Sequence, residues 1–518
     1  MSVFSGTADH SPGYRWLLAA GFSLLAAVYC VWTWSHELAE FGGDNAIYIL
    51  TAHYFSPWSG HSDVAAYFAK HSQYPPLFPF VLAIFGGGEN LLIAHIITTI
   101  CLLSALVVFY YWLTVLGFSA FHAGMAGLLV AVLPGTYMEA LSVHSENLYL
   151  LLSLSGLLAV SIAEKSERTA WYWLAALCIA AATLTRGVGV SLVAAFACYM
   201  ALRRPPRALS YVVVCLFPVV LWNLLWLKHG PSYLDSFNQK YMGMSLDTLV
   251  SHVGVQLHAM WYGWAGNFSA SHIGLPVMSV IGMICLLGAT HRISLRKLDG
   301  YYVAAYLFLI LVWPFPAEAR RFIFAIMPVL LVQGLLFLEV VPGKGRLHRL
   351  FDFRIITILS IFLIALPALA LNASRFMKRP PGNLAAYRHN LGWYALDPRE
   401  ALSNIAFNYA LADHLRQIKS IVPADSCIYS IKPSIVGFYA DRISMIPPRE
   451  NIDDKAFKSS LKETGCRYFY LMGFSSPSFS KPYYPADRLQ DSLKILNAVR
   501  IAGDDKMPVG VLVELVER

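Results

Sequence analysis

An aspartate that follows two glycines is the first candidate for chemistry. Asp44 stands in the stretch FGGDNAIY, directly after the first long apolar run. Paired glycines let a ligand approach the backbone closely, and Tyr48 falls on the same helical face one turn later. A carboxylate there can take the proton from a sugar hydroxyl or a phosphate acceptor. A helix N-terminal acid without chemistry is the simpler interpretation. We predict that Asp44 is a catalytic base.

Three arginines form a second group. Arg186 lies in TLTRGVG between two apolar runs, and Arg320 and Arg321 lie in AEARRF. A basic side chain at membrane depth costs about 1–3 kcal/mol, so it usually has a partner. Snorkelling to lipid head groups, or pairing with the nearby Glu318, would satisfy these side chains. Because the guanidinium fork matches phosphate oxygens, we predict a clamp for the phosphate of a lipid-linked substrate.

A second acid and three histidines complete the candidates. Glu146 opens an apolar run in HSENLYLL, so it either starts a helix or orients an acceptor or a metal ion. With carboxylates nearby, His53, His61 and His144 offer ligands for a divalent metal ion, but no ligand spacing identifies a site. A satisfied surface histidine is the simpler interpretation of each. The sequence predicts no cofactor, and a divalent metal ion stays an open alternative.

Membrane helices must position these residues. Of the 518 residues, 57% are hydrophobic and only 14% are charged, and the mean hydropathy is +0.54. The apolar blocks are long enough to cross about 30 Å of hydrocarbon at 1.5 Å per helical residue. No alternating pattern of a membrane β-barrel occurs, so the spanning part is helical. The net charge of +8 sits mostly in short loops, which argues against nucleic acid as a partner.

The sequence predicts a polytopic α-helical membrane protein with about eleven spans. The predicted inner loops, such as RRPPR at 203–207, HRISLRK at 291–297 and GKGRLHRLFDFR at 343–354, are rich in Lys and Arg, as cytoplasmic loops are. The first run is longer than a signal-peptide core, so we predict an uncleaved anchor with a cytoplasmic N-terminus. The spans are expected at about 16–34, 91–113, 119–133, 146–163, 171–185, 188–202, 210–228, 273–290, 301–314, 322–340 and 355–372.

This topology places every candidate residue on the outer side of the membrane. The first outer loop, 35–90, contains an apolar piece at 77–85 that is too short to span, and we expect helices at the membrane surface there. The other outer segments are 134–145, a long loop at 229–272, the short loop 314–321, and everything after about residue 373.

The composition changes near residue 375 to that of a soluble domain. We therefore predict a membrane domain at 1–375 and a periplasmic α/β domain at 376–518. Helical periodicity covers 402–418 and 453–464, and β-rich runs cover 427–431, 443–446, 467–472 and 509–516. Cys427 and Cys466 can form a disulfide if this domain lies in an oxidising compartment, although two cysteines make no framework.

The motifs together resemble a known superfamily. An early Gly-Asp, then YPPLFPF, then SENLYLLL, then LTRGVG and a late RRFIFAIMPVLLV follow one another on the predicted outer face. This order looks like the GT-C superfamily of membrane glycosyltransferases. It is most similar to the branch that holds protein O-mannosyltransferases and bacterial lipid A aminoarabinose transferases. The resemblance covers about 15–375, and the stretch PADSCIYSIKPSIVGFYADRISMIPP resembles the periplasmic domain of bacterial members.

The resemblance implies a transferase of the bacterial inner membrane that uses a polyprenyl-phosphate-linked sugar. Asp44 matches the family's catalytic aspartate, and Tyr74 begins the YPP that matches its Pro-Pro turn. Among the remaining candidates, Tyr48 and His53 would orient the acceptor or a metal ion. The resemblance further implies that Glu146 matches the second loop acid, Arg186 the threonine-arginine motif, and Arg321 or Arg320 the late donor-binding arginine.

Two departures keep the acceptor open. Many relatives have Asp-Glu where this chain has Asp44-Asn45, and the aminoarabinose branch has an acid and a lysine where this chain has Gln73-Tyr74. The acceptor could be a protein, a lipid or a polysaccharide. Transfer in a single displacement predicts inversion at the anomeric carbon. The alternatives are a flippase or other transporter of lipid-linked sugars, and a polysaccharide polymerase or ligase that uses an oligosaccharide donor.

Overall fold

The computed structural model describes residues 12–226, 233–242, 244–269, 274–340, 352–476, 479–489, 492–501 and 507–516. These residues form two compact units. The first contains the described residues up to Trp34, then Gln73–Phe78 and His95–Ser374, and the second contains Ser35–Ser72, Pro79–Ala94 and the described residues from Arg375 onward. The predicted first outer loop thus belongs largely to the same unit as the C-terminal part, a grouping that the predicted domain boundaries do not include.

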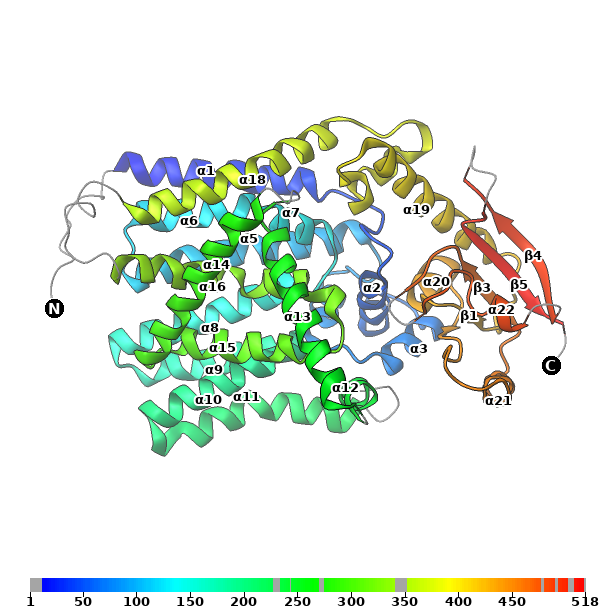
Figure 1. Ribbon diagram of the computed structural model, residues 1–518, viewed down its shortest axis with the longest axis horizontal. Coiled ribbons are helices and arrows are strands. Elements are labelled where there is room, and N and C mark those ends of the chain that lie inside the picture. The colour runs from blue at the N-terminus through cyan, green and yellow to red at the C-terminus, as the bar shows by residue number, and fades with distance from the viewer. Residues whose placement is uncertain are drawn as a thin grey trace. The chain divides into compact units, whose positions relative to one another are not determined.

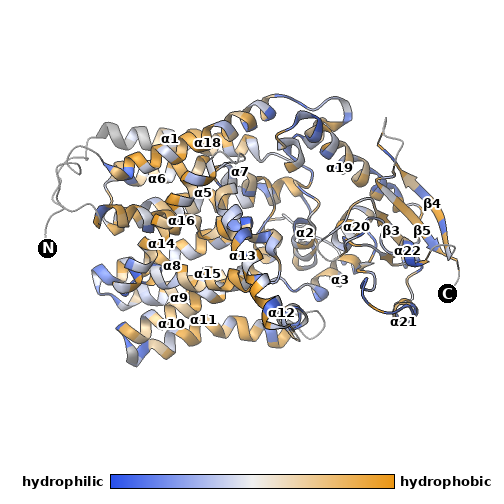
Figure 2. Cartoon of the chain, in the orientation of Figure 1, coloured by the Kyte–Doolittle hydropathy of each residue, from blue (hydrophilic) through white to orange (hydrophobic). Residues whose placement is uncertain are grey.

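The first unit is helical, and most of its long helices run in the same general direction (Figure 1). Apolar residues cover most of their length, as the sequence pattern predicts (Figure 2). The helices are α1 (Pro12–Trp32), α5 (Leu91–Leu116), α6 (Ala120–Val132), α7 (Pro134–Leu141), α8 (Glu146–Ser166), α9 (Thr169–Thr185), α10 (Val190–Arg203), α11 (Pro205–Trp226), α12 (Tyr233–Tyr241), α13 (Leu246–Gly266), α14 (Leu275–Ser294), α15 (Leu298–Leu311), α16 (Ala319–Val340) and α18 (Phe353–Met377), with short 3-10 turns η1 (Gly187–Gly189) and η3 (Pro316–Glu318).

Within the described residues, six helices are long and apolar enough to cross a membrane, or seven if α6 and α7 count as one span bent by 56°. Four shorter apolar helices accompany them, in α1, α9, α10 and α15. Each predicted span coincides with a helix, so the chain is a multi-pass membrane protein. The count of eleven crossings stays a prediction. The predicted inner loop at 343–354 lies mostly outside the described residues, as do residues 1–11.

Helix α16 forms the centre of the first unit. It packs against α8, α13, α14 and α15. Of the residues in its most apolar stretch, 72% are buried. Glycines permit the closest of these contacts, since a Cβ on Gly288 of α14 would lie 2.2 Å from the backbone oxygen of Gln333 in α16. The predicted long loop at 229–272 is also largely helical, because α12 and α13 lie within it. The N-terminus of α16, which carries Arg320 and Arg321, is therefore held by its neighbours.

The second unit contains a sheet of five strands in the order β2-β1-β3-β5-β4. β1 pairs in parallel with β2 and β3, whereas β5 pairs antiparallel with β3 and β4. The strands are β1 (Ile428–Tyr429), β2 (Ser444–Met445), β3 (Tyr468–Met472), β4 (Leu493–Val499) and β5 (Gly510–Leu515); the helices are α2 (Asp44–Phe55), α3 (Asp63–His71), α4 (Leu77–Ile84, its first two residues in the first unit), α19 (Pro398–Ile418), α20 (Pro433–Ala440), α21 (Asp454–Thr464) and α22 (Ala486–Leu489), with 3-10 turns η4 (Gly382–His389) and η5 (Leu391–Tyr394).

Four strands and two helices of this unit follow the sequence predictions, and the expected helices in the first loop are present as α2, α3 and α4. A disulfide joins Cys427 to Cys466. The first loop is fixed to the C-terminal part by Glu37, whose carboxylate accepts hydrogen bonds of 2.6 and 2.9 Å from Arg416 on α19. The hydroxyls of Tyr387 and Tyr439 also donate to Glu37, at 3.4 and 3.3 Å.

A buried histidine makes the stability of the second unit sensitive to pH. His414 of α19 is 2% exposed, with the hydroxyl of Tyr470 2.9 Å from Nδ1. Burial lowers the pKa of His414 from 6.5 to about 4. Because the unfolded chain binds this proton at higher pH, stability present above pH 6.5 is lost as the pH falls toward 4.

We expect the free energy of unfolding to fall by on the order of 2 kcal/mol over this window. Thermal melts of the full-length protein in detergent between about pH 7 and pH 4.5 measure it. His414→Leu should flatten the profile, whereas His61→Asn, at an exposed position, should leave it unchanged. A wild-type melting temperature that is constant across this range would contradict the prediction.

Candidate functional site

Four chain segments of the first unit meet at one charged cluster. Pro134 starts α7 after the bend that ends α6, and α7 carries Glu139. Glu146 starts α8, and Arg186 follows α9 in extended conformation, with φ −147° and ψ 138°. The turn after Arg186 requires a glycine, because a Cβ on Gly189 would lie 2.6 Å from the Cα of Thr183. The N-terminus of α16 supplies the fourth segment. Each charged side chain thus stands at or next to a helix end or bend.

Glu146 is the centre of the cluster. Its side chain is fully buried, and its Oε2 lies 2.6 Å from Nη1 of Arg186. Its Oε1 accepts a hydrogen bond of 2.9 Å from Nε of Arg321 and lies 2.8 Å from Nη2 of the same arginine. The carboxylate of Glu146 therefore contacts two guanidinium groups that lie far apart in the sequence. Such charge-assisted contacts are short and fix the geometry of both partners.

Arg186 has two further contacts that fix its position. Its Nη1 donates a hydrogen bond of 3.1 Å to the hydroxyl of Ser145. Its guanidinium carbon lies 5.1 Å from the ring centroid of Phe322, the residue after Arg321. A cation over an aromatic face gains roughly 0.5–2 kcal/mol. The Arg186 guanidinium is thereby held between α8 and α16.

A second ion pair lies beside the first. Nη2 of Arg320 is 3.1 Å from Oε1 of Glu139, and Oε2 of Glu139 is 3.3 Å from Nδ1 of His144. The side chains of Glu139 and His144 are 2% and 1% exposed. The backbone oxygen of Glu139 also accepts a hydrogen bond of 3.2 Å from the amide of Asn147. Glu139 thus carries out for Arg320 what Glu146 does for the other two arginines.

One sequence interpretation needs correction, and one partner was missed. Arg320 and Arg321 pair with Glu139 and Glu146, acids that local proximity does not suggest. His144 is buried, which contradicts the interpretation as a surface histidine. Its nearest acid, Glu139, is not among the sequence candidates. The signal for Glu139 is a carboxylate inside the apolar stretch 119–141, where an acid is costly without a partner.

The cluster is rich in positive charge. In the described part of the chain, the ion pairs above join three guanidinium groups to the carboxylates of Glu139 and Glu146. The side chains of Arg320 and Arg321 are 29% and 14% exposed, whereas that of Arg186 is 9% exposed. Burial lowers the local dielectric, so these guanidinium groups attract an anion more strongly than they would in water. The arrangement suits an anionic group that reaches Arg320 and Arg321 from the exposed side.

A metal ion fits the same residues less well. Glu139, His144 and Glu146 offer ligand atoms that lie within 4.8 Å of one another. Both oxygens of Glu146 already face arginines, and those of Glu139 face Arg320 and His144. A divalent cation would have to displace a guanidinium and would add charge to a cluster that is already positive. Because of its arginines, the cluster suits an anion better than a divalent cation.

A glycine on α13 sets the position of the arginine pair. A Cβ on Gly263 would lie 2.9 Å from the backbone nitrogen of Arg320 and 3.0 Å from its Cα. Backbone atoms cannot rotate away, so Gly263→Ala should push the start of α16 outward and cost about 1–3 kcal/mol.

Gly254 on the same helix is the matched control, because a methyl group added at its Cα would have no neighbouring atom within 4 Å. Gly254→Ala should be neutral or stabilise by about 0.5–1 kcal/mol, as in any exposed helix interior. Melting temperatures of the two variants give the comparison. Equal changes in melting temperature at both positions would show that the close approach of Gly263 to Arg320 does not affect stability.

Asp44 is the first residue of α2 in the second unit, as predicted, and is half-buried. The glycines before it have a structural reason. Gly43 has φ of +108°, which favours glycine, and its backbone oxygen accepts a hydrogen bond of 2.9 Å from the hydroxyl of Ser434. The backbone oxygen of Gly42 accepts from Nζ of Lys432 at 2.7 Å. The start of α2 is thereby fixed to the start of α20.

The remaining candidates lie at separate points. Tyr48 is 2% exposed on α2, and Nδ1 of His53, near the end of this helix, is 3.6 Å from a carboxylate oxygen of Glu89. Tyr74 is half-buried in a bend of the first unit. The structure thus brings together Glu146, Arg186 and Arg321 directly, with Arg320 beside them. It groups Asp44, Tyr48 and His53 on one helix.

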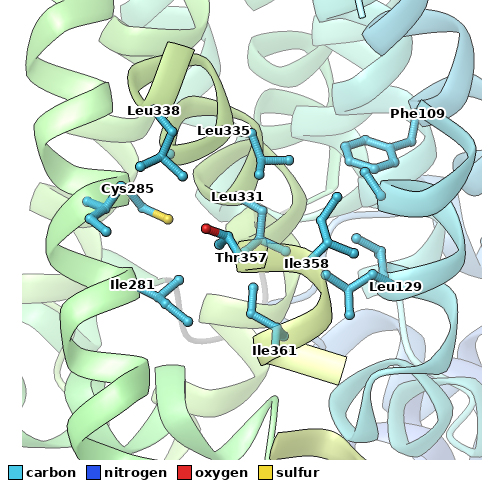
Figure 3. Close-up of a pocket in the computed structure, with 14 residues that line it drawn as sticks. Phe109, Leu129, Ile281, Cys285, Leu331, Leu335, Leu338, Thr357, Ile358 and Ile361 are labelled. Atoms are coloured by element: carbon cyan, nitrogen blue, oxygen red, sulfur yellow. The ribbon is translucent and has the colours of Figure 1, made fainter. Parts of the chain in front are cut away.

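An apolar pocket of the first unit lies between α5, α6, α14, α16 and α18. Figure 3 shows Leu331 and Leu335 of α16 between Cys285 of α14 and Ile358 of α18. Thr357 contributes the one hydroxyl among the lining side chains, and none of them is charged. The pocket therefore offers no group for acid–base or phosphate chemistry.

The amino-acid sequence matches no family model and no curated protein sequence. The structure is similar to ArnT from Cupriavidus metallidurans in the apo state, with 16% identity, a TM-score of 0.54, and coverage of 97% of this chain and 98% of that chain. The same protein bound to undecaprenyl phosphate gives a TM-score of 0.52 with the same identity and coverage. The chain has the GT-C fold.

A second GT-C structure agrees. The archaeal oligosaccharyltransferase AglB from Archaeoglobus fulgidus, in complex with an inhibitory peptide and a dolichol-phosphate, is 12% identical, with a TM-score of 0.50. The match covers 89% of this chain and 70% of that chain. The GT-C resemblance predicted from the order of short motifs is thus confirmed for the fold.

Proposed function

We propose that this chain is a membrane glycosyltransferase that moves a sugar from a polyprenyl-phosphate donor to an acceptor. The observation that carries the proposal is the buried cluster of three arginines on two carboxylates, set in a GT-C fold. A lipid phosphate is an anion that reaches such a cluster from within the membrane. Two similar structures contain this class of ligand, namely undecaprenyl phosphate in ArnT and a dolichol-phosphate in AglB.

The arginines bind and stabilise the phosphate in this proposal. Arg320 and Arg321 have the more exposed guanidinium groups, so they contact the phosphate oxygens. Arg186 is more buried than the other two arginines and contacts the same carboxylate as Arg321, so it adds positive potential without touching the phosphate. When the bond to the sugar breaks, negative charge on the departing phosphate grows. Donors that are already fixed in place stabilise this charge without reorganisation. Glu146 and Glu139 position the arginines, and Glu146 also stays a candidate for orienting the acceptor.

Asp44 is the proposed base. It takes the proton from the acceptor hydroxyl, whose oxygen then attacks the anomeric carbon as the bond to phosphate oxygen breaks. This single displacement inverts the anomeric centre, and positive charge develops on the sugar ring, as in glycoside chemistry generally. Tyr48, one turn along α2, is buried and supports the start of this helix, and His53 and Tyr74 stay candidates for orienting the acceptor.

The proposed location is the bacterial inner membrane, with about eleven crossings, a cytoplasmic N-terminus and a periplasmic C-terminal domain. The disulfide between Cys427 and Cys466 supports an oxidising compartment for the second unit. The Lys- and Arg-rich segments at 203–207 and 291–297 support a cytoplasmic side for the opposite ends of the helices. Tagging each predicted loop with a compartment-dependent reporter tests this topology.

Binding of undecaprenyl phosphate, compared with undecaprenol, tests the phosphate site. Purified full-length protein should bind the phosphate at least tenfold more tightly, since charged hydrogen bonds are worth about 1.5–3 kcal/mol each. Arg321→Gln should remove most of the difference. The variant Arg207→Gln, at an arginine of a predicted inner loop, is the control. Equal affinity for both lipids would overturn the phosphate site.

A transporter of lipid-linked sugars is the second candidate, since it would use the same arginines without chemistry. Transporters usually bind near the bilayer midplane at internal repeats. The sequence shows no internal repeat, and the cluster lies at helix ends, which favours the enzyme. A polymerase or ligase would share the fold and the phosphate cluster. Transfer of one sugar, as against a preassembled chain, distinguishes the two enzymes.

A further inference from the structure

A basic and apolar surface follows the last apolar helix. α18 ends at Met377, which is 81% exposed, and the exposed side chains of Lys378 and Arg379 come next. We call Met377, Lys378 and Arg379 the helix-end patch. In the described part of the chain, neither Lys378 nor Arg379 takes part in an ion pair. Two unneutralised cations thus stand beside a large exposed apolar side chain.

The patch sits on a rigid support. Nη2 of Arg375 donates to the backbone oxygen of Leu396 at 3.4 Å, and its guanidinium lies 5.2 Å from the ring centroid of Trp393. The indole of Trp393 donates back to the backbone oxygen of Arg375 at 2.8 Å. Arg388 covers the ring of Phe376 at 4.4 Å. The end of α18 is therefore fixed, and Leu396, 57% exposed, adds apolar surface.

The chain segment that contains the patch carries charges of one sign. Between Asp352 and Asp397 the sequence contains no acidic residue, whereas Arg375, Lys378 and Arg379 follow one another closely. Basic residues after a span usually mark the cytoplasmic side. In the topology proposed above this segment lies on the opposite side, so orientation does not explain the charges.

Much of the helix that leads to the patch is exposed, as expected for a span that faces lipid. Of the residues in the most apolar stretch of α18, only 28% are buried, and Leu363 and Leu366 are 64% and 45% exposed. A lipid-facing span ends among lipid head groups, where Lys and Arg meet phosphates. The position of the patch thus follows from the continuity of the chain with α18.

We propose that the helix-end patch binds anionic phospholipid head groups of the bilayer. Lys378 and Arg379 contact the phosphodiester, and Met377 lies in the upper acyl region. The ligand is a bulk membrane lipid such as phosphatidylglycerol, which is distinct from the sugar donor of the proposed function. The patch would hold the start of the second unit at the level of the head groups.

Native mass spectrometry of the full-length protein in detergent tests this proposal. Phosphatidylglycerol and phosphatidylcholine with identical acyl chains are added in equal amounts. Because each basic residue near an anionic surface contributes substantially, wild type should prefer phosphatidylglycerol about tenfold. Lys378→Gln combined with Arg379→Gln should reduce the preference to about twofold or less. The control pair Lys455→Gln and Lys458→Gln, on exposed lysines of α21, should keep it.

A charge-preserving variant and a second anionic lipid make each outcome decisive. The swap Lys378→Arg with Arg379→Lys keeps the charge and should keep the preference, and its loss would overturn an electrostatic head-group site. No preference in wild type, or equal loss in the control pair, would overturn the proposal as well. Undecaprenyl phosphate added in place of phosphatidylglycerol should bind with little dependence on the patch. A stronger dependence for that lipid would assign the patch to the donor instead. None of these arms measures sugar transfer, so they are independent of the proposed function.

Discussion

Replacing Glu146 with alanine is expected to abolish sugar transfer and to destabilise the protein by about 3–5 kcal/mol. Its fully buried carboxylate holds Arg186 at 2.6 Å and Arg321 at 2.8 Å. Removing the carboxylate leaves two guanidinium groups that repel each other without the charge that joins them. Breaking one side of a buried ion pair is costly for this reason. Melting temperature in detergent and transfer from a lipid-linked donor measure the two effects.

Matched variants separate charge from packing at this position. Glu146→Gln keeps the shape but loses the charge, so it should lie between alanine and wild type in stability and still lack transfer. Removing all three charges, with Glu146→Leu, Arg186→Met and Arg321→Met, should recover much of the stability but no activity. Asp247→Ala, at an exposed acid in the first turn of α13, should keep full transfer and cost no more than about 0.3–1 kcal/mol. A stable and active Glu146→Ala protein would contradict the positioning role.

Asp44→Asn is expected to lower the rate of sugar transfer by about 10²–10⁴-fold without weakening donor binding. The amide has the size of the carboxylate but cannot take a proton. The phosphate contacts in the proposal come from Arg320 and Arg321, so affinity for polyprenyl phosphate should be unchanged. Turnover and donor Kd, measured on the same preparation, distinguish a base from a binding group.

Asp63 provides the control for a purely structural role of Asp44. It is also the first residue of a helix in the first loop, α3, and its side chain is 86% exposed. Both aspartates stabilise a helix N-terminus by about 0.3–1 kcal/mol. Asp63→Asn should therefore share the small stability loss but retain full transfer. An Asp44→Asn protein with the turnover of Asp63→Asn would exclude Asp44 as the base.

The helices were predictable because lipid imposes long apolar runs. The apolar run that starts at Glu146 predicts an end near 163, and α8 ends at Ser166. Elements without a simple periodic pattern were missed. β4 is an edge strand with a mostly half-exposed pattern, so its residues do not alternate between apolar and polar. Helix α20 was missed for the opposite reason, because nearly all of its residues are buried.

The types of the site residues were predictable, but their partners were not. Arg186, Arg320 and Arg321 stand out in the sequence as basic residues at membrane depth. Their partners lie far away in the sequence, since Glu146 precedes Arg321 by 175 residues and Glu139 precedes Arg320 by 181. Local proximity favours Glu318 instead. Only the packing of α16 against α7 and α8 makes the observed pairs.

The role of the Gly42-Gly43 pair also depends on tertiary structure. Two glycines before an acid suggest room for a ligand. The structure shows that Gly43 needs a positive φ and that both backbone oxygens accept hydrogen bonds from the start of α20. Ser434, which donates one of them, is 391 residues away. A short motif in one loop cannot reveal such a distant partner.

Release of polyprenyl phosphate from synthetic polyprenyl-phosphate monosaccharides tests the central claim most directly. A panel of sugars is incubated with purified wild-type protein, with Asp44→Asn beside it, and the liberated lipid phosphate is quantified. Wild type should release lipid phosphate from at least one sugar donor, and Asp44→Asn should not. Tight binding of the donors without release by either protein would contradict the enzyme and favour a transporter or an oligosaccharide donor.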